Sequence, residues 1–490
     1  MATFHLANFG CRASQADGAA LKRQLMEAGF EEAGEVGPSD VAVLNTCTVT
    51  AAADAEVRQV IRRIHRANPG CRILVTGCYA QRAPEEIAAL EGVTWVIGNS
   101  HKHRVAEVLQ AAALGPAPGS RRCEETERVM VGEIAPQFHF APVFPDDRTR
   151  PTLKVQDGCA ARCSFCVIPA VRGPSRSLAP DQVIAQVLQL EREGYQEIVL
   201  SGINLGSYGR DLDRRIHFLG LLERILGETS IARLRISSIE PMDISPELIR
   251  LAAREKRLAD HFHVPLQSGS DRLLRLMNRR YWTRQYAERI LAIREALPQA
   301  GIGADVMAGF PGETEEDHAA SAEFIERLPF TYLHVFPYSA RPGTAAAARP
   351  GQVNGNVVRE RARELRALSD RKRQGFLASQ IGRTLSVLTL DNAAGAETMA
   401  LSSNYLKVSL PASNFAANKW VDVQVARASA GVLHGFPLRD AVDAPALSRG
   451  VGVRLAVPSL GSRAHSKGTA SRTPTARERG LGQTAAFRRR

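Results

Sequence analysis

Short apolar runs alternate with amphipathic stretches along residues 1–115. The apolar runs cover residues 3–9, 41–45, 72–76 and 94–97, and helical patterns cover residues 19–28 and 54–65. Strands that alternate with helices in this way predict a parallel sheet flanked by helices. We therefore expect an open α/β domain over residues 1–115.

The same alternation of strand and helix returns between residues 153 and 339. Its candidate strands are residues 153–155, 197–201, 233–237, 261–265, 303–308 and 332–338. Six successive β/α units indicate a barrel or an incomplete barrel, whose site lies at the C-terminal ends of the strands. We expect a partial (β/α)6 barrel over residues 146–378, including a helical pattern at residues 357–378.

A third pattern of strands and polar turns follows the barrel. Residues 385–390, 405–410 and 420–426 predict a small β-barrel, expected over residues 379–437. Such barrels often bind RNA through basic and aromatic side chains, here Tyr405, Lys407, Phe415, Lys419 and Trp420. In the alternative interpretation the aromatic side chains fill the core of this barrel, and the sequence leaves both open.

Two segments lack these patterns. Proline and glycine are dense in residues 115–150, which predicts a connector over residues 116–145 with a short extended piece at residues 129–134. Residues 438–490 show no sustained apolar period and are predicted to be disordered. The fold class expected for the chain is thus α/β, with a small C-terminal β-barrel and a basic tail.

Composition narrows the class of protein. The 490 residues are 44% hydrophobic and 23% charged, which is typical of a soluble globular protein. No apolar run reaches the length of about 18 residues that spans a bilayer, and no signal-peptide core is visible. We expect a cytoplasmic protein without a membrane partner, whose eight cysteines are metal ligands or free thiols rather than disulfides.

The net charge of +12 is concentrated at one end. Residues 441–490 hold ten Lys or Arg against Asp443 and Glu478, so they carry +8 and the rest of the chain +4. A basic protein is compatible with a nucleic-acid partner. Because most of this charge lies on the predicted tail, it does not by itself locate a binding surface.

The strongest chemical signal is a CxxxCxxC run formed by Cys159, Cys163 and Cys166, directly after an apolar segment. Three thiols so close in sequence can converge on one metal centre but leave it one ligand short. A structural zinc site requires four closed ligands. An iron-sulfur cluster held by three cysteines keeps one iron open for a substrate or cofactor, whereas buried inert thiols are the alternative.

A second trio is predicted in the N-terminal domain. Cys11, Cys47 and Cys78 each lie within two residues of the end of a predicted strand. In an open α/β sheet these ends share one edge, where ligands bind, so the three thiols should meet in space. Cys71 precedes its strand and Cys123 follows the last helix, so both are expected to be ordinary thiols.

Polar and glycine residues follow the predicted barrel strands. They include Ser201-Gly202-Ile203-Asn204, Ser238, Glu240, Gln267-Ser268-Gly269-Ser270, Ala308-Gly309-Phe310-Pro311-Gly312 and Arg341. Each alone is more often a turn residue than a ligand contact. Their repetition along one rim favours a binding site at the barrel mouth.

With both trios, the chain up to residue 437 resembles the methylthiotransferases of the radical S-adenosylmethionine (SAM) superfamily. The segments that carry the resemblance are Asn45-Thr46-Cys47-Thr48-Val49-Thr50, Val75-Thr76-Gly77-Cys78-Tyr79-Ala80-Gln81, Pro265-Leu266-Gln267-Ser268-Gly269-Ser270-Asp271 and His334-Val335-Phe336-Pro337-Tyr338-Ser339. They look most like the branch that acts on N6-threonylcarbamoyladenosine beside the anticodon of tRNA. Ala170 stands where that branch often has an aromatic residue, residues 400–403 match loosely, and the tail has no counterpart.

The resemblance implies an N-terminal methylthiotransferase domain, a radical SAM barrel and a TRAM domain. It implies that Cys159, Cys163 and Cys166 hold a SAM-cleaving 4Fe-4S cluster, and that Cys11, Cys47 and Cys78 hold an auxiliary 4Fe-4S cluster that carries the sulfur. The SAM contacts expected from it are Phe165, Ser201, Gly202, Asn204, Ser238, Glu240, Gln267, Ser268, Asp305, Gly309 and Arg341.

The reaction implied is the methylthiolation of an unactivated aromatic C–H, for which a radical cofactor is needed. The expected partners are the anticodon loop of tRNA and an electron donor such as flavodoxin or ferredoxin, and the protein is expected to be a monomer. Two alternatives stay open. One is a methylthiotransferase for isopentenyl-adenosine in tRNA or for a ribosomal-protein aspartate, and the other is a non-catalytic RNA-binding iron-sulfur protein.

Overall fold

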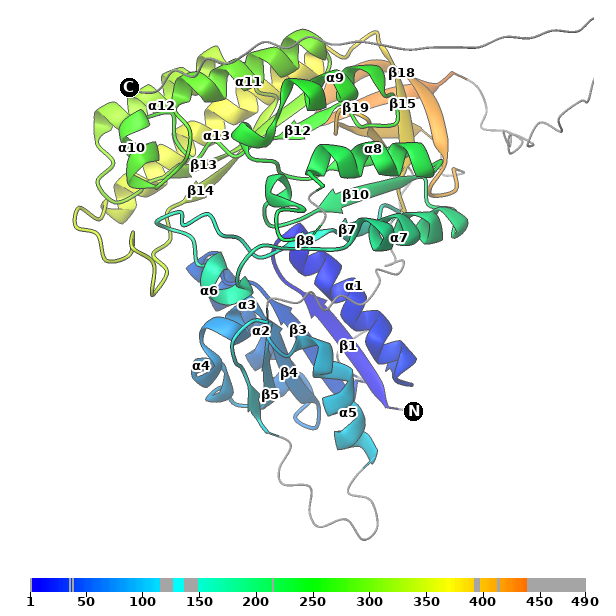
Figure 1. The fold of residues 1–490 in the computed structure, drawn as a ribbon, viewed down its shortest axis with the longest axis vertical. Coiled ribbons are helices and arrows are strands. Elements are labelled where there is room, and N and C mark those ends of the chain that lie inside the picture. Colours follow the sequence, from blue (N-terminus) through cyan, green and yellow to red (C-terminus); the bar gives the residue numbers. More distant parts are fainter. Residues whose placement is uncertain are drawn as a thin grey trace, which may run out of the picture. The chain divides into compact units, whose positions relative to one another are not determined.

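The computed structural model describes residues 2–34, 37, 39–114, 127–135, 149–213, 216–391, 397–411 and 415–438. These residues lie within a single unit, Met1–Ala441. Figure 1 shows three successive sets of elements in it: an N-terminal sheet with its helices, a central arc of strands under helices, and a C-terminal barrel. The predicted disorder of residues 439–490, most of the connector and Cys123 lie outside the described residues.

The N-terminal sheet has six parallel strands in the order β2-β1-β3-β4-β5-β6. The strands are β1 (Thr3–Asn8), β2 (Glu31–Glu32), β3 (Val41–Thr46), β4 (Arg72–Gly77), β5 (Val93–Gly98) and β6 (Val129–Met130). The helices are α1 (Arg12–Glu27), α2 (Ala51–Ala67), α3 (Cys78–Arg82), α4 (Pro84–Ala88), η1 (Lys102–Arg104) and α5 (Val105–Leu114). The predicted open α/β fold is confirmed, and the extended piece expected at residues 129–134 supplies the sixth strand.

Helices cover both faces of this sheet because successive strand residues point to opposite sides. Val41 and Val43 pack with α1 and α5, whereas Ala42 and Leu44 pack with α2, α3 and α4. The central strand β3 is accordingly buried at every position, as expected for a strand of a parallel sheet covered on both faces. Because helices bury both faces of the sheet, a ligand is expected to bind at the carboxyl ends of its strands.

The central domain contains six parallel strands in two sheets, β11-β10-β7 and β12-β13-β14. Its strands are β7 (Thr152–Lys154), β8 (Gln156–Asp157), β9 (Arg176–Ser177), β10 (Glu197–Ser201), β11 (Arg233–Ile236), β12 (His261–His263), β13 (Gly301–Ala308) and β14 (Tyr332–Pro337). Single parallel bridges, Leu234 with Leu258 and Ser238 with His263, join the two sheets. The arc is the expected partial barrel, and β7 and β14 are its two edges among the described strands.

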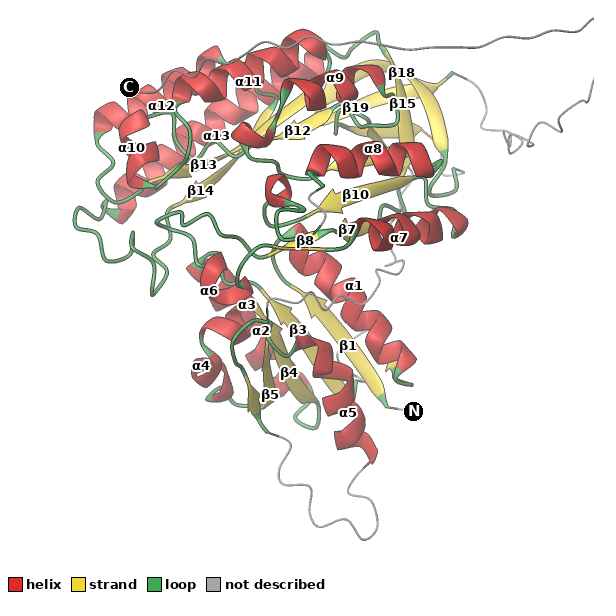
Figure 2. Ribbon diagram, in the orientation of Figure 1, coloured by secondary structure: helices red, strands yellow, loops and turns green. Residues whose placement is uncertain are grey.

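Helices line the outside of the arc (Figure 2). They are α7 (Pro180–Arg192), α8 (Phe218–Glu228), α9 (Pro246–Arg254), α10 (Asp271–Leu276), α11 (Thr283–Ala296), α12 (Glu315–Arg327) and α13 (Gly355–Ala378). The short helix α6 (Ile168–Arg172) lies beside α3, and η2 (Leu205–Ser207) and η3 (Pro241–Asp243) follow β10 and β11. One continuous hydrophobic core runs between these helices and the strands. The core reaches the carboxyl ends of two strands, at Ile236 of β11 and Ala308 of β13. The N-terminal domain lies below the arc in the view of Figure 1.

The C-terminal domain is a closed five-stranded barrel in the order β15-β16-β17-β19-β18. Its strands are β15 (Thr384–Thr389), β16 (Glu397–Ser402), β17 (Lys407–Pro411), β18 (Trp420–Ser429) and β19 (Val432–Pro437). The sequence pattern predicted three of these strands and missed β16 and β19. Residues 400–402, which match the resembled family loosely, are a buried part of β16 and pair with β15 and β17.

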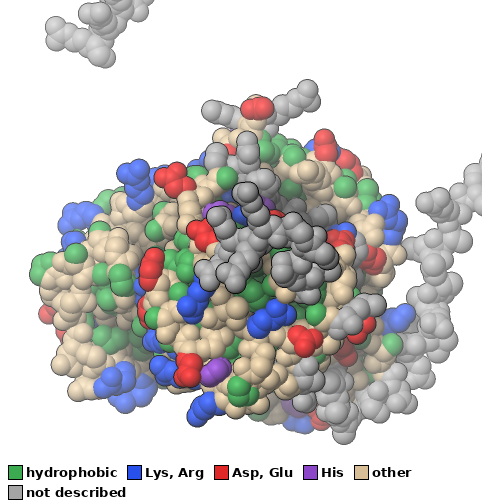
Figure 3. All heavy atoms as spheres, turned by 90° about the horizontal axis from the view of Figure 1, so that it is seen from below, with side chains coloured by type: hydrophobic (Ala, Val, Ile, Leu, Met, Phe, Trp, Pro, Cys, Tyr) green, Lys and Arg blue, Asp and Glu red, His purple; other side chains and the backbone are tan. Residues whose placement is uncertain are grey.

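Two surface properties bear on partners. In the described part of the chain, no helix combines the length and the apolar character that crossing a membrane requires. On the face of the N-terminal domain shown in Figure 3, Lys and Arg side chains are interspersed with Asp and Glu. Basic charge does not gather into one patch on that face, in keeping with the concentration of net charge in residues 441–490.

Candidate functional site

The N-terminal cysteines stand at the ends of three neighbouring strands. Cys11 follows β1, Cys47 follows β3 and Cys78 opens α3 directly after β4. The strand ends are level, because Asn8 pairs with Asn45 and Thr46 pairs with Gly77. The structure therefore brings the trio to one edge of the sheet, as the sequence predicts.

Glycines at the strand ends let these turns approach one another. Gly10 has φ +100°, and a Cβ placed on it would lie 2.4 Å from the Cβ and 2.7 Å from the Sγ of Cys47. Gly77 has the same φ, and its Cβ would lie 2.4 Å from the carbonyl oxygen of Thr46. Only glycine adopts this backbone at no steric cost, so Gly10 and Gly77 permit the close packing of the turns that carry the thiols.

The environment of the trio disfavours free thiolates. Burial, together with the neighbouring Cys11 and Cys78 thiols, raises the pKa of Cys47 to about 12. Cys47 and Cys78 are buried, whereas Cys11 is exposed and its sulfur lies 3.7 Å from the Ser14 hydroxyl. Binding of a metal replaces such protons, so three converging thiols suit a cluster better than they suit isolated anions.

The second trio lies on the loop between β8 and α6. Its backbone is held from several sides: the Cys159 amide donates to the Gly173 carbonyl at 3.0 Å, and the Ser164 amide donates to the Met277 carbonyl at 3.0 Å. Burial raises the pKa of Cys166 to about 12, with a further contribution from Cys163 and Cys159. These three thiols are thus close neighbours, as the CxxxCxxC spacing predicts.

A charged pair stands next to this loop. Arg279 donates through Nη1 to the sulfur of Cys163 at 3.3 Å and forms a partly buried ion pair with Glu240. Asn204 approaches the sulfur of Cys159 at 3.9 Å, and its Oδ1 is buried without a hydrogen-bond partner. A cavity of about 160 Å³ opens here, lined in part by Cys163, Asn204, Glu240 and Arg279. Its mixed donors and acceptors are suited to the amino and carboxylate groups of an amino acid.

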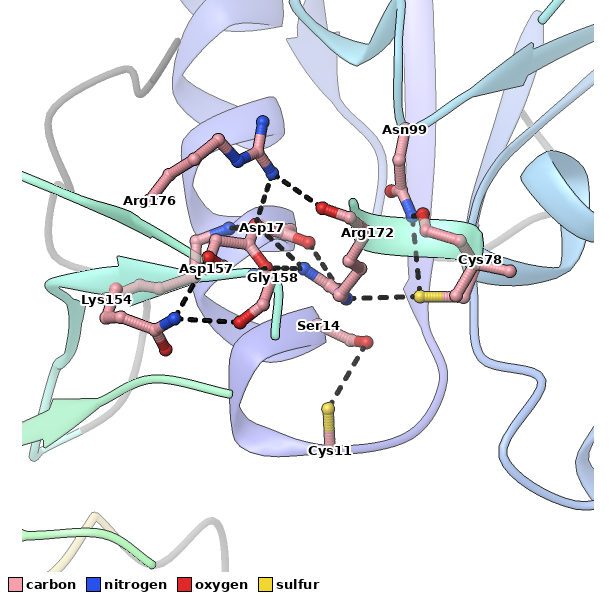
Figure 4. A network of polar contacts seen from close by, with 12 residues as sticks. Cys11, Ser14, Asp17, Cys78, Asn99, Lys154, Asp157, Gly158, Arg172 and Arg176 are labelled. Atoms are coloured by element: carbon pink, nitrogen blue, oxygen red, sulfur yellow. Dashed lines mark hydrogen bonds and ion pairs between the residues drawn. The ribbon is translucent and has the colours of Figure 1, made fainter. Parts of the chain in front are cut away.

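One buried arginine lies between Cys78 and the carboxylates of Asp17 and Asp157 (Figure 4). Arg172, 2% exposed on α6, donates through Nε to the sulfur of Cys78 at 3.2 Å. Its Nη1 donates to both carboxylate oxygens of Asp157 at 2.9 and 3.0 Å, and its Nη2 donates to Asp17 at 2.9 Å. Asp157 lies two residues before Cys159, so the guanidinium spans from one cysteine set to the other.

Further charges complete this network. Asp17 on α1 also pairs with Lys154 on β7 and, at 2.9 Å, with Lys102. Burial opposes the ionisation of Asp17, yet these cations together with Arg172 hold its pKa well below the usual value. The N-terminal domain therefore contacts the barrel through a buried ion network beside the cysteines.

The inner face of the arc carries a chain of hydrogen bonds. Tyr332 lies over Gly303, and its Oη contacts His261 Nε2 at 2.8 Å and His263 Nδ1 at 3.0 Å. His263 Nε2 lies 2.9 Å from Asp305, which also lies 3.3 Å from His334 Nδ1. Burial opposes the ionisation of Asp305, and the two imidazoles lower its pKa below the usual value.

The ligand atoms of His263, Asp305 and His334 lie within 4.8 Å of one another, a spacing compatible with a metal ion. Asp305, however, already accepts from both imidazoles. His334 is exposed on the inner face and pairs in register with Asp305. We therefore interpret the three side chains as a polar wall of the arc rather than as a metal site.

The other predicted contacts divide into two groups. Gly202, Asn204 and Glu240 lie close to the cysteine loop: a Cβ on Gly202 would approach Gln156, and Gln156 accepts from the Asn204 amide at 2.8 Å. The remaining predicted residues at these strand ends are Phe165, packed with Phe310, together with Ser201 (buried), Ser238 (exposed) and Gln267 (half-buried, φ +67°).

Three predicted contacts are engaged elsewhere. Ser268 is 1% exposed, and its oxygen accepts from the Ser270 amide at 3.1 Å. Gly309 is packed against Val358 of α13, where a Cβ would lie 2.4 Å from a methyl carbon. Arg341 is 5% exposed and donates to Asp54 of the N-terminal domain at 2.7 Å. These are packing and domain contacts, and Nε and Nη1 of Arg341 are buried without a hydrogen-bond partner. The SAM contacts expected of the three residues stay predictions.

The predicted RNA-contacting aromatics lie at the junction of the small barrel with the arc. Tyr405 stacks on His261 with ring centroids 4.5 Å apart and accepts from Arg12 at 2.7 Å. Trp420 donates to Gln196 at 3.1 Å and lies under Arg233. Phe415 packs against the barrel core, whereas Lys407 and Lys419 are exposed.

Sequence reasoning missed the arginines that contact sulfur, Arg172 and Arg279. Arg172 lies six residues after the last cysteine of its motif, and Arg279 follows Asn278 at the end of a helix far along the chain. The only feature of the sequence that could have indicated them is a basic residue near clustered cysteines. Many other arginines of the chain would satisfy the same criterion. Their role depends on carboxylate partners that only the fold brings together.

Comparisons with known proteins agree with this geometry. Residues 153–325 match the radical SAM superfamily, and residues 3–98 match an uncharacterized protein family, UPF0004. The threonylcarbamoyladenosine tRNA methylthiotransferase MtaB of Aquifex aeolicus is 38% identical, covering 81% of this chain and 94% of its own. The protein of the same name from Bacillus subtilis is 37% identical, and the match covers 90% of this chain and 96% of that protein.

Two further comparisons are more distant. A tRNA-2-methylthio-N(6)-dimethylallyladenosine synthase of Pelotomaculum thermopropionicum is 32% identical over 79% of this chain and 86% of its own. Among solved structures, the radical SAM methyltransferase TsrM of Kitasatospora setae, with cobalamin and a [4Fe-4S] cluster bound, matches with a TM-score of 0.52. The two chains are 17% identical, and the match covers 71% of this chain and 77% of TsrM. This structural similarity shows a shared fold.

Proposed function

The chain belongs to the radical SAM tRNA methylthiotransferases, and we propose that it methylthiolates carbon 2 of N6-threonylcarbamoyladenosine beside the anticodon of tRNA. The observation that carries this proposal is the presence of two cysteine trios in one molecule. Arg172 lies between them, contacting Cys78 of one trio and Asp157, which precedes the loop of the other. Relatives named for this nucleoside match nearly their whole length at 37–38% identity.

The two trios fit the cofactors of the family, two 4Fe-4S clusters and SAM. We assign Cys159, Cys163 and Cys166 to the SAM-binding cluster and Cys11, Cys47 and Cys78 to the second. When bound, these groups supply the one-electron chemistry that an aromatic C–H requires. The described neighbours of the first trio, Asn204, Glu240 and Arg279, are placed to orient the amino-acid part of SAM.

The remaining residues of the site hold and shield the reactants. The polar wall of His263, Asp305 and His334 faces the inside of the arc, where a nucleobase with a polar N6 substituent finds hydrogen-bond partners. Exposed Phe336 stands in the same row of β14 and offers a stacking surface for a base. Unstacked anticodon-loop bases are commonly held in this way.

The proposal extends to organisation and partners. It assigns residues 1–115 to a methylthiotransferase domain, 146–378 to the radical SAM domain and 379–437 to a TRAM domain, linked by residues 116–145 and followed by the tail. We expect a cytoplasmic monomer that takes electrons from a flavodoxin or ferredoxin. The bacterial origin of the relatives and the shared fold support these expectations.

The activity is tested with anaerobically purified protein and with tRNA that carries threonylcarbamoyladenosine without the methylthio group. Mass spectrometry of the digested nucleosides should show the addition of a methylthio group to that nucleoside, with 5'-deoxyadenosine as coproduct. Methylthio transfer to isopentenyl-adenosine instead would favour the other tRNA branch. A protein that contains iron and sulfide but forms no 5'-deoxyadenosine in the assay would favour the non-catalytic iron-sulfur alternative.

Cysteine variants separate the two centres. Cys163→Ala should abolish formation of 5'-deoxyadenosine under dithionite, because the first trio loses a ligand. Cys47→Ala should lower bound iron to about half while SAM cleavage continues, because one of two four-iron clusters is lost. Cys71→Ala is the matched control, because Cys71 is a buried thiol at the other end of β4. A Cys47→Ala protein with unchanged iron content would refute the second centre.

A further inference from the structure

The sulfur of Cys78 receives hydrogen bonds from both domains. Asn99, after β5 of the N-terminal sheet, donates through Nδ2 at 3.4 Å, and Arg172 of α6 donates through Nε at 3.2 Å. Asn99 also donates to the Val171 carbonyl at 2.8 Å, and Val171 packs on Cys78. Helix α6 of the barrel domain thus completes the surroundings of a cysteine in the N-terminal domain.

Arg172 is fixed in this position by its other two nitrogens. Nη1 is held by Asp157 and Nη2 by Asp17, so the planar guanidinium has no freedom to turn away from Cys78. With the side chain 2% exposed, water cannot substitute for any of these partners. The arrangement in Figure 4 therefore aims a permanent positive charge at one sulfur.

Arg172 shares its two carboxylates with other cations. Lys102 and Lys154 contact Asp17, and Lys154 also contacts Asp157. Arg172 contacts both carboxylates. A buried charge is costly unless an opposite charge lies nearby. The thiolates of a cluster on the N-terminal trio are the anions toward which Arg172 points.

We propose that Arg172 is a positioning residue for the N-terminal cluster, donating an N–H to the Cys78 thiolate and thereby raising the reduction potential of that cluster. The inference rests on the proposed function, because it takes Cys11, Cys47 and Cys78 as ligands. Reduction adds negative charge to a cluster, and a cationic donor to a ligand sulfur stabilises the reduced form. Asn99 contributes a weaker neutral donor to the same sulfur.

The same contact ties the two centres together. Asp157 orients Arg172 and lies two residues before Cys159, so the loop of the barrel trio and the sulfur of the N-terminal trio share one guanidinium. The N-terminal cluster consequently acquires its full potential only when the barrel domain is docked. A purely structural ion pair between the domains would hold them together without affecting that potential.

The experiment uses the full chain with Cys159, Cys163 and Cys166 replaced by alanine, so that any cluster signal belongs to the N-terminal trio. Iron content and the electron paramagnetic resonance signal are measured during a potentiometric titration. Into this background are introduced Arg172→Met, Arg172→Gln, Arg172→Lys and Asn99→Ala. Arg235→Met is the matched control, because Arg235 is an equally buried arginine whose hydrogen bonds go to Glu197 and to carbonyls of the small barrel.

The potential should shift to more negative values in Arg172→Met and Arg172→Gln. A smaller shift is expected in Arg172→Lys, which keeps the charge but cannot reach two carboxylates and a sulfur together. Asn99→Ala should shift it slightly in the same direction, and Arg235→Met should leave it unchanged.

An unchanged potential in whichever Arg172 variants fold and bind iron overturns the inference while leaving the proposed function intact. A shift of equal size in Arg235→Met also overturns it, because the effect would then follow from any buried arginine. If the background protein binds no cluster at all, the assignment of the N-terminal trio fails, and the inference fails with it.

Discussion

Gly10 occupies a position that has room for no side chain. Its φ of +100° lies in the region that favours glycine, and a Cβ would overlap the Cβ and Sγ of Cys47. Gly29 also has positive φ, at +85°, but nothing lies within 4 Å of its Cβ position. The two glycines therefore separate the cost of backbone strain from the cost of crowding a thiol.

Gly10→Ala should remove the N-terminal cluster. Both Gly10→Ala and Gly29→Ala carry a backbone strain of about 1–3 kcal/mol, but only Gly10→Ala displaces Cys47 from the trio. We expect iron to fall to about half in Gly10→Ala, since one of two four-iron centres is lost. Gly29→Ala should keep its iron. Equal iron in both variants would mean that the turn at Gly10 does not shape the site.

At the scale of elements, strand β10 begins with a buried carboxylate. Glu197 is fully buried and pairs with Arg235 at 2.7 Å and with Arg150 at 3.2 Å. Burial raises its pKa, but the arginines outweigh burial and hold the pKa at about 2. Because Arg235 also donates to carbonyls of Ser402 and Ser403, the pair joins the arc to the small barrel.

Glu197 should make stability depend on acid pH. Its folded pKa of about 2 lies below the ordinary value of 4.5, so its contribution is complete above pH 4.5 and is lost as the pH falls toward 2. A difference of this size corresponds to about 3 kcal/mol. Thermal melting between pH 7 and pH 3 should show Glu197→Gln less stable at pH 7 and less sensitive to acid than the wild type.

The matched control is Glu228→Gln, which changes an exposed glutamate of α8. Its melting temperature should follow that of the wild type across the range. A Glu197→Gln variant with the full acid sensitivity of the wild type would show that other carboxylates account for that sensitivity.

Elements also show what the sequence could predict. An apolar run precedes each of Cys11, Cys47 and Cys78, and a cysteine just after each predicted strand places the trio by topology alone. Strand β16 was missed because Glu397–Ser402 lacks a regular alternation of apolar and polar residues, and its burial comes from the neighbouring strands of the closed barrel. The contacts of Arg172 with the N-terminal domain could not be predicted from the sequence. Asp17 and Arg172 are 155 residues apart and pair only because the two domains dock.

For the molecule as a whole, a second contact between the domains lies beside Cys47. Asp54 of α2 accepts from Arg341 at 2.7 Å and from Arg82 at 2.9 Å, and the Ser339 hydroxyl accepts from the Ala51 amide at 2.9 Å. The start of α2 is therefore docked on the segment after β14. This contact and the Arg172 network fix the N-terminal sheet at two separate places on the arc.

Arg341→Met should uncouple the two halves of the reaction. If Arg341 acts by docking, SAM cleavage persists under dithionite, whereas methylthio transfer to tRNA falls at least about tenfold, as small misplacements of reacting groups can cost 100-fold. The measurement is the ratio of 5'-deoxyadenosine to methylthiolated nucleoside. Asp54→Asn should reproduce the effect. Loss of SAM cleavage in Arg341→Met, but not in Asp54→Asn, would instead mark Arg341 as a cofactor contact.

The short helix α6 has a consequence for interpreting sequence variants. It begins two residues after Cys166, so a substitution in Ile168–Arg172 would ordinarily be ascribed to the neighbouring motif. Its side chains nevertheless lie against Cys78, some 90 residues upstream in the chain. A natural variant in this helix would therefore present as a defect of the remote centre, although its position in the sequence would assign it to the neighbouring motif.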